Sequence, residues 1–161
     1  MERKMRRFKQ QLPEEEIKGI LYSGKYAVLA VEGDDSYPYA VPVNYVFDGK
    51  AIYIHSAKEG HKVDSIRRNP KCSLCVVSKD KIVPEEFTSY FESVIVFGKA
   101  FIAEDTDEVV YALRLLSEKY SPGINPENEI TKFLNTVCII RIDIEAFSGK
   151  EAIELTRQRK Q

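Results

Sequence analysis

Runs of apolar and β-branched residues recur along the chain and predict a protein built mainly of β-strands. Clusters of Gly, Pro, Asn, Asp and Ser separate these runs, as expected for the turns between strands. The predicted strands span residues 25–31, 37–47, 50–56, 71–78, 89–103 and 136–144. A polar stretch around Pro84 predicts a loop at residues 79–88, and Gly98 predicts a bend or bulge within the fifth strand.

Segments with helical spacing flank these strands and predict three or four short helices. Pro13 suits the first position of a helix whose apolar stripe of Ile17, Ile20 and Leu21 ends at Gly24. A second helix is predicted at residues 63–68. A third is predicted to follow an N-cap at Asp105 with Glu108, and a fourth to follow an N-cap at Asn125.

A small antiparallel sheet has two unpaired edges, which proteins close or cover to avoid edge-to-edge association. About six antiparallel strands with short flanking helices therefore predict a β-barrel. The length of 161 residues suits one compact domain. We expect a single domain over residues 1–161, with a basic N-terminal arm at 1–11 and a C-terminal tail at 151–161. The basic residues at both ends are expected to be solvated and frayed.

The Asp48-Gly49 turn predicts both a register and two distinct faces for the hairpin around it. A two-residue loop places Phe47 opposite Lys50 and Pro42 opposite His55. The face expected to point into the barrel carries Val41, Val43, Tyr45, Ile52 and Ile54. The other face carries Pro42, Asn44, Tyr53 and His55. Because this second face is partly polar and partly aromatic, we expect something to cover it.

Charge and hydropathy argue against several classes of partner. The 24 basic and 25 acidic residues nearly cancel, which argues against a dedicated nucleic-acid surface. No segment approaches the roughly 20 consecutive apolar residues needed to span a bilayer. The N-terminus also lacks the apolar stretch of a secretory signal. We expect a cytoplasmic protein that binds neither nucleic acid nor membrane.

Cys72 and Cys75 have the spacing of a zinc or redox motif, but their setting favours neither. They lie in an apolar run without a second pair or a nearby histidine, and residues three apart on a strand point to opposite faces. With Cys138 they are expected to be reduced thiols, and no metal site is predicted.

The segment 55–62, His-Ser-Ala-Lys-Glu-Gly-His-Lys, carries the most informative chemistry. Ser56 supplies a hydroxyl, Lys58 and Lys62 supply ammonium groups, and Gly60 precedes a predicted helix start. Phosphate binding needs this combination of compact positive charge and short hydrogen-bond donors. The segment matches neither glycine-rich nucleotide motif, and by itself it could be a charged surface turn. Because it directly follows the polar and aromatic hairpin face, it favours a phosphorylated, flat heteroaromatic ligand.

Three segments together carry a resemblance to a known family. They are residues 37–45 (Tyr-Pro-Tyr-Ala-Val-Pro-Val-Asn-Tyr), 54–64 (Ile-His-Ser-Ala, then Gly60, Lys62 and Asp64) and 93–100 (Ser-Val-Ile-Val-Phe-Gly-Lys-Ala). In this order they resemble the FMN-binding proteins related to pyridoxamine phosphate oxidase, and most closely the nitroimidazole-resistance (Nim) group. The resemblance extends from the basic arm to Ser148-Gly149-Lys150, where the family has Thr-Gly-Lys. Leu12 stands where the family often has a Ser or Thr cap.

The resemblance implies a split barrel that forms a homodimer with two FMN molecules between its subunits. Carried over by position, Pro42, Val43 and Asn44 lie along the flavin ring, and Ser93 lies on a strand that passes close to the cofactor. The residues implied to hold the ribityl phosphate are His55, Ser56, Ala57, Lys58 and Lys62, with Gly60 giving the loop its turn.

A bound flavin carries the redox chemistry itself, so the protein supplies position and access. The resemblance therefore implies an oxidoreductase that passes electrons from a reduced nicotinamide to a small acceptor such as a nitroaromatic. The alternatives are a flavin-binding or storage module without turnover, and a related split barrel that holds haem or a deazaflavin. His61 is the candidate catalytic residue, although a loop histidine beside phosphate donors is more often a cofactor contact or simply exposed. Arg141 and Asp143 share a strand face and are expected to form an ion pair.

Overall fold

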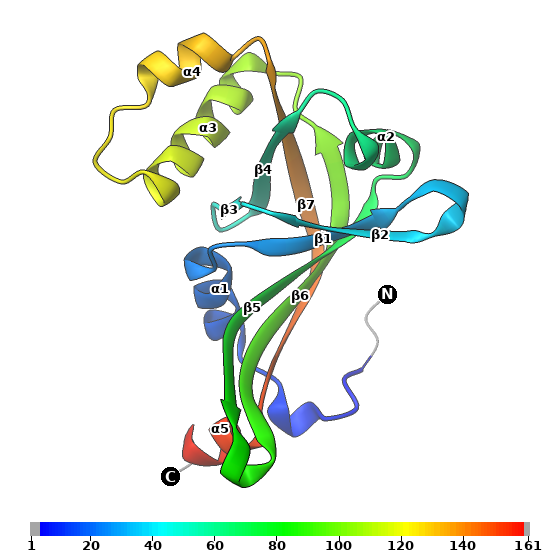
Figure 1. Cartoon of the computed structure of the whole chain (residues 1–161), viewed down its shortest axis with the longest axis vertical. Helices are drawn as coiled ribbons and strands as arrows, with labels where there is room; N and C mark the ends of the chain where they lie inside the picture. Colours follow the sequence, from blue (N-terminus) through cyan, green and yellow to red (C-terminus); the bar gives the residue numbers. More distant parts are fainter. Residues whose placement is uncertain (1–3, 160–161) are drawn as a thin grey trace.

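The computed structural model describes residues 4–159 and shows one antiparallel sheet surrounded by short helices (Figure 1). The strands are β1 (Ala27–Glu32), β2 (Pro38–Val43), β3 (Val46–Phe47), β4 (Ala51–Ala57), β5 (Lys71–Val83), β6 (Thr88–Ile102) and β7 (Val137–Glu151). The α-helices are α1 (Glu14–Ser23), α2 (His61–Arg68), α3 (Thr106–Tyr120), α4 (Glu127–Phe133) and α5 (Ile153–Arg159). Three short 3-10 turns are η1 (Phe8–Gln10), η2 (Asp34–Ser36) and η3 (Pro84–Glu86). Arg3 and Lys160, two of the basic residues expected at frayed ends, lie outside the described residues.

The order of strands in the sheet is β2-β1-β5-β6-β7-β4-β3, which confirms a mainly-β split barrel but leaves it open. The two end strands, β2 and β3, are consecutive in the chain and are separated only by Asn44 and Tyr45. The chain therefore crosses from one edge of the sheet to the other through these two residues. In the described part of the chain β2 pairs with β1 alone, so the prediction of one continuous strand at 37–47 paired with 50–56 is wrong.

The β3–β4 hairpin forms where the sequence predicts it, but its register differs by two residues. Phe47 lies opposite Ile52, so the loop is Gly49-Lys50 and not Asp48-Gly49. The Asp48 carboxylate accepts hydrogen bonds of 2.8 Å from two backbone N–H groups of the turn, which holds Asp48 at the strand end. Gly49 then takes the left-handed position at φ +96°, where a side chain would be strained.

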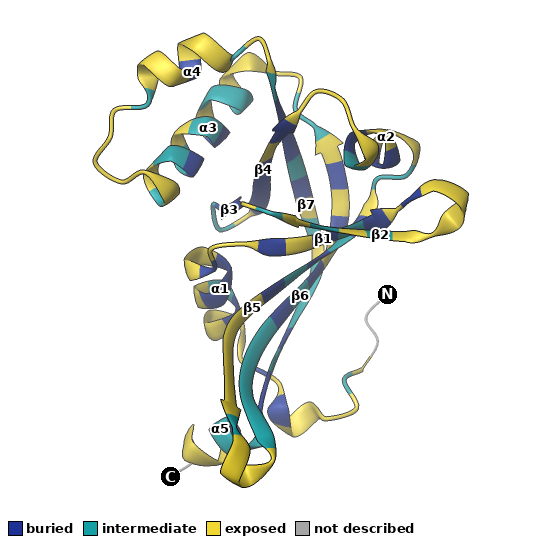
Figure 2. Cartoon of the chain, viewed as in Figure 1, coloured by how far each residue is buried: buried dark blue, intermediate teal, exposed yellow. Residues whose placement is uncertain are grey.

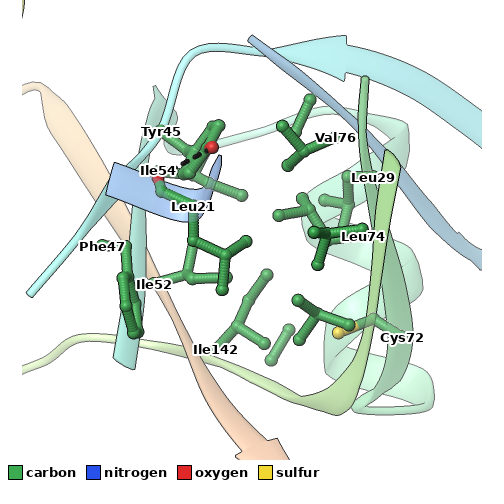
Figure 3. Close-up of a cluster of buried hydrophobic side chains, with 14 of the residues drawn as sticks. Leu21, Leu29, Tyr45, Phe47, Ile52, Ile54, Cys72, Leu74, Val76 and Ile142 are labelled. Carbon is green, nitrogen blue, oxygen red and sulfur yellow. Dashed lines mark hydrogen bonds between the residues drawn. The ribbon is translucent and has the colours of Figure 1, made fainter. Parts of the chain in front are cut away.

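The shift of two residues keeps every side chain on its predicted face, because strand side chains alternate with a period of two. Tyr45, Ile52 and Ile54 are all fully buried in the barrel interior (Figure 3). The Tyr45 hydroxyl donates a 2.9 Å hydrogen bond to the backbone carbonyl of Leu21 and so ties helix α1 to the barrel. Each large side chain buried in this way contributes about 1.5–3 kcal/mol.

The helix boundaries expected at Gly24 and Asp105 are confirmed, whereas two others are wrong by one residue. Pro13 is the N-cap of α1 and not its first helical residue, and the N-cap of α4 is Pro126 and not Asn125, although the Asn125 side chain accepts a 3.1 Å hydrogen bond from the Glu127 N–H. Helix α1 ends at Gly24, whose N–H donates to the carbonyl of Ile20. The Asp105 carboxylate accepts from the Glu108 N–H at 3.1 Å at the start of α3. The expected ion pair between Arg141 and Asp143 is also present, at 2.9 Å.

Strands β5 and β6 continue past the barrel as a two-stranded arm, residues 78–92, which replaces the predicted loop at 79–88 (Figure 1). Most of the outer arm is exposed (Figure 2), and Lys79 pairs with Glu92 across it at 2.9 Å. An exposed two-stranded ribbon needs no apolar face, so its polar sequence looks like that of a loop.

The C-terminal residues form helix α5, so a frayed tail is not observed over the described residues. Arg159 donates a 2.8 Å ion-paired hydrogen bond to the carboxylate of Glu151, which is only 2% exposed, and also pairs with Glu16. The side chain of Gln10 donates to the Glu151 carbonyl from the N-terminal segment. Both ends of the described chain are therefore held at one site.

Gly98 marks a β-bulge, as its position in an apolar strand predicts. The register between β6 and β7 shifts between Phe97 and Gly98. A Cβ atom built on Gly98 would collide with the backbone carbonyl oxygen of Asp143, so the two strands approach too closely here for any side chain.

We expect Gly98→Ala to lower the free energy of unfolding by about 1–3 kcal/mol, because the added methyl must push β7 away. Gly19→Ala is the matched control, since no atom lies within 4 Å of the Cβ that it would add on helix α1. The control should raise stability by about 0.5–1 kcal/mol. Urea unfolding of both variants measures the difference, and equal stability of the two would contradict the close approach at Gly98.

Candidate functional site

Two free strand edges diverge from the crossing at Asn44 and Tyr45, and the predicted site residues lie along both. Pro42 and Val43 are on β2, whose outer edge is unpaired in the described chain. Strand β4 pairs with β3 only at Ile52 and Tyr53, so beyond them one of its edges is free as well. Unpaired backbone N–H and C=O groups at such edges are available to hydrogen-bond a ligand.

Asn44 is held in a fixed position at the crossing. Its side-chain amide donates a 3.1 Å hydrogen bond to the carbonyl of Lys25, which leaves its own carbonyl oxygen as a free acceptor. The Tyr120 hydroxyl lies 2.7 Å from the same Lys25 carbonyl and accepts from the Tyr45 N–H at 3.0 Å. The end of helix α3 therefore fixes both residues of the crossing.

Lys119 reaches the same point and is unusual in having an uncharged partner. Its ammonium donates to the Tyr45 carbonyl at 3.0 Å and lies 4.1 Å from the centre of the Tyr45 ring. Burial lowers the pKa of Lys119 to about 8. A desolvated cation therefore contacts Tyr45, the residue that follows Asn44, and the family resemblance implies that Asn44 lies along the flavin ring.

Three cations gather at the other edge, where β4 ends. Lys58 and Arg67 line a common cavity with Cys138, and Lys62 lies on the first turn of α2. Burial raises the pKa of the Cys138 thiol, and the positive charges of Arg67, Lys58 and Lys62 oppose that rise. Cys138 pairs with Ser56 in the ladder between β4 and β7. We call Ser56, Lys58, Lys62 and Arg67 the phosphate cluster.

The hydroxyl of Ser56 is the second observation that points to an anion at this cluster. Ser56 is 8% exposed, and its Oγ has no hydrogen-bond partner among the described residues. A buried hydroxyl without a partner costs about 1–3 kcal/mol, so such groups normally meet a ligand or water. Three cations and a free hydroxyl are the donors that a phosphate requires, so the residues present fit this part of a flavin mononucleotide.

His55 and Ala57 lie on the opposite face of β4 from Ser56. Both are exposed, and both, together with Ser56, line a cavity of about 390 Å³ between β4 and helices α3 and α4. Apolar side chains from the helices, Leu113, Ile130 and Phe133, form its other wall. Local sequence patterns give no sign of these three, because only the packing of the helices brings them to the strand.

Tyr53 is covered by the protein and not by a ligand. It is 7% exposed and packs edge to face against Tyr111 of α3, with ring centres 5.9 Å apart. Burial raises the pKa of Tyr53 to about 12. The hairpin face predicted to be covered is therefore divided, since α3 covers Tyr53 while Pro42, Asn44 and His55 remain exposed.

His61 starts helix α2 and contacts the turn between β1 and β2. Its ring stacks on Tyr39 with centres 4.0 Å apart, and its Nε2 lies 3.7 Å from the Asp34 carboxylate. A hydrogen bond from Arg68, together with the nearby His61, lowers the pKa of Asp34. These contacts attach α2 to the turn, and a catalytic role of His61 stays a prediction.

Ser93 lies far from the phosphate cluster of its own chain. On β7, Ser93 pairs with Lys150, whereas His55 pairs with Ile139. The next residue of β7, Ile140, pairs with Ile102, so His55 lies level with the end of β6. The path along β6 from residue 93 to residue 102, at about 3.3 Å per residue, is roughly 30 Å. One chain therefore does not bring Ser93 to the phosphate cluster.

A further cavity, of about 1070 Å³, lies on the outer face of β6 and β7 beneath the N-terminal segment. Phe8, Ile95, Phe97 and Phe147 line it together with Arg6. Phe97 is 54% exposed and Phe8 is 68% exposed, so a continuous aromatic surface is open to solvent here.

Among the helices of residues 4–159, none has the length and apolar character to span a membrane.

Comparison with known sequences gives two matches that cover most of the chain. A family model described as pyridoxamine 5'-phosphate oxidase matches residues 13–151. The uncharacterized protein RA0666 of Rhizobium meliloti (strain 1021) is 34% identical over 155 residues, which are 90% of this chain and 96% of that protein.

Solved structures share the fold. A candidate 5-nitroimidazole antibiotic resistance protein from Bacteroides thetaiotaomicron superposes with a TM-score of 0.75 at 21% identity, covering 88% of this chain and 86% of that one. A FAD-binding protein from Mesorhizobium loti superposes with a TM-score of 0.67 at 25% identity, covering 88% and 96%. The flavocytochrome Anf3 from Azotobacter vinelandii superposes with a TM-score of 0.76 at 18% identity, covering 92% and 72%.

Proposed function

Because the chain belongs to the pyridoxamine 5'-phosphate oxidase family, we propose that it binds FMN and passes electrons from a reduced nicotinamide to a small acceptor such as a nitroaromatic. The observation that supports this best is the phosphate cluster. There the buried Ser56 hydroxyl, which has no hydrogen-bond partner among the described residues, lies on the same part of the fold as three cationic side chains. Flavins or haem are named for three similar structures, which agrees with a cofactor of this kind. The three cysteines of the chain are free thiols, and we propose that the protein works in the cytoplasm, where the reducing environment keeps thiols unpaired.

The two strand edges suit the two ends of the cofactor. Ser56, Lys58 and Lys62 would hold the phosphate, and Gly60, at φ +128°, lets the loop turn between the two lysines. The free carbonyl oxygen of Asn44 would accept a hydrogen bond from the edge of the ring. Pro42 and Val43 would lie along the ring.

A bound flavin supplies the hydride and electron transfer. Lys119 places a positive charge, or a neutral amine above a pH of about 8, beside the crossing. Positive charge near a flavin favours its reduced, anionic form. The chain's own contribution is therefore to bind the phosphate, to orient the ring and to set the charge beside it.

Completion of the site calls for a second copy of the chain. Ser93, Ile95 and Phe97 alternate on β6 and so share its outer face, which carries the exposed aromatic surface. A two-fold dimer that covers this surface would also bury Ser93 at the interface and could deliver it to the partner's flavin. We therefore propose a homodimer with two flavin sites between the subunits.

We expect Lys58→Ala and Lys62→Ala each to weaken FMN binding by about 1.5–3 kcal/mol, since each removes a charge-assisted contact to the phosphate. Lys50→Ala is the matched control, because Lys50 is an exposed lysine in the β3–β4 turn. Quenching of FMN fluorescence on titration with protein measures all three affinities. Unchanged affinity in both site variants would show that the phosphate binds elsewhere.

The FMN-loaded protein should be bleached by NADH or NADPH under argon and recover its colour when a nitroimidazole is added. Absorbance near the main flavin band follows both steps. A flavin that binds tightly, yet is reduced by neither nicotinamide, would favour a storage module over an oxidoreductase.

Phe97→Asp should convert the dimer to a monomer and weaken FMN binding in parallel, because a buried charge without a partner opposes association. Ile124→Asp is the control, since Ile124 is 68% exposed in the loop between α3 and α4. Sedimentation velocity gives the mass, and fluorescence gives the affinity. A monomeric variant with unchanged FMN affinity would place Ser93 outside the site.

A further inference from the structure

A cavity of about 310 Å³ adjoins the end of β4 and shares Lys58 and Arg67 with the phosphate cluster. Its remaining walls come from the end of β6, the first turns of α3 and the segment between α4 and β7, which meet at one end of the barrel (Figure 1). Small-molecule pockets range over about 300–1,000 Å³, so this one suits a single nucleoside-sized group.

The lining of this cavity suits a flat base. Aliphatic side chains, among them Ile102, Val109 and Leu134, provide apolar walls. Asn135 and Thr106 add an amide and a hydroxyl to the lining, besides the charged Lys58, Arg67 and Glu104. An Asn amide can pair with adenine at both N6 and N7, which is a common protein contact to this base.

The charge of the phosphate cluster exceeds what one phosphate needs. A phosphate monoester carries about −1.5 to −2 at pH 7, whereas Lys58, Lys62 and Arg67 together carry three positive charges. Arg68 is not available to a ligand in the same way, because it forms a 2.8 Å ion pair with Asp34. Arg67 is held more loosely, with its guanidinium 3.7 Å from the Asp64 carboxylate. A second phosphate next to the first would compete with Asp64 for the positive charge of Arg67.

We propose that this cavity binds the adenosine phosphate end of a dinucleotide. The inference rests on the proposed flavin site, since the two share Lys58 and Arg67. Two molecules carry this group, namely FAD and the reduced nicotinamide donor. Glu104, the one carboxylate among the lining residues, can accept hydrogen bonds from ribose hydroxyls and disfavours a 2'-phosphate, as acidic residues do in other dinucleotide sites.

Titration calorimetry with 5'-AMP on the full-length protein tests this inference. The variant Asn135→Trp fills part of the cavity and should weaken AMP binding by about tenfold or more. Asn128→Trp is the matched control, because Asn128 is exposed on α4 and lines none of the three cavities described above. Adenosine 2',5'-bisphosphate should bind more weakly than AMP.

The same titration in saturating FMN distinguishes the two sources. If AMP still binds in saturating FMN, the cavity holds the adenosine end of the nicotinamide donor. If AMP binds only without FMN and is displaced by FAD, the cavity holds the adenosine end of FAD. No AMP binding at millimolar concentration, or an equal loss in both Trp variants, overturns the inference. If FMN binds in those samples, the cavity inference fails alone, and if FMN fails too, the flavin proposal falls with it.

Discussion

The crossing of the chain from one sheet edge to the other at Asn44 and Tyr45 is the constraint on which the rest of the structure depends. A continuous strand at 37–47 would pair along β4 and close the barrel with backbone hydrogen bonds. Because the chain instead leaves β2 at Val43 and resumes pairing at Val46, the barrel stays open, and the two edges of the sheet are joined only by the chain itself. Tyr45 keeps the crossing in place from the inside through its hydrogen bond to Leu21, and α3 keeps it in place from the outside.

The open edges carry costs that the remaining fold must offset. Within residues 4–159, the buried Ser56 hydroxyl has no hydrogen-bond partner, and the desolvated Lys119 ammonium has no carboxylate partner. Each such group opposes folding by an amount comparable to one good core contact. The interior of fully buried Leu, Ile and Val side chains supplies the stabilising free energy, and the bulge at Gly98 lets β6 and β7 approach closely enough to complete it. In a well-packed protein an unsatisfied polar group is expected where a ligand binds, and among the described residues the buried hydroxyls of Ser56 on β4 and Ser65 on α2 are such groups.

The sequence predicts well whatever is decided by residues close together in the chain. The cap at Asp105, the bulge at Gly98 and the inward side of the β3–β4 hairpin all follow from local spacing and are confirmed. The prediction of a loop at 79–88 is wrong because the polar arm has no buried face, and without one its sequence shows no alternation of apolar and polar residues. The unpaired edge of β2 could not be predicted from the sequence, because apolar and polar residues alternate along a strand in the same way whether or not a neighbouring strand pairs with it. The walls that α3 and α4 give to two cavities depend wholly on tertiary packing.

The separation between Ser93 and His55 follows from the length of β6, and it couples the proposed cofactor to assembly. If the flavin contacts the phosphate cluster of one chain and the Ser93 face of another, it binds the dimer and not the monomer. Any ligand that binds only the associated state stabilises that state by mass action. Flavin and subunit would then each raise the apparent affinity of the other, and dilution of the protein alone would release cofactor. The proposed dimer would also cover the aromatic surface around Phe97, which is exposed in one chain, and exposed apolar surfaces of this kind mark interaction sites in many proteins.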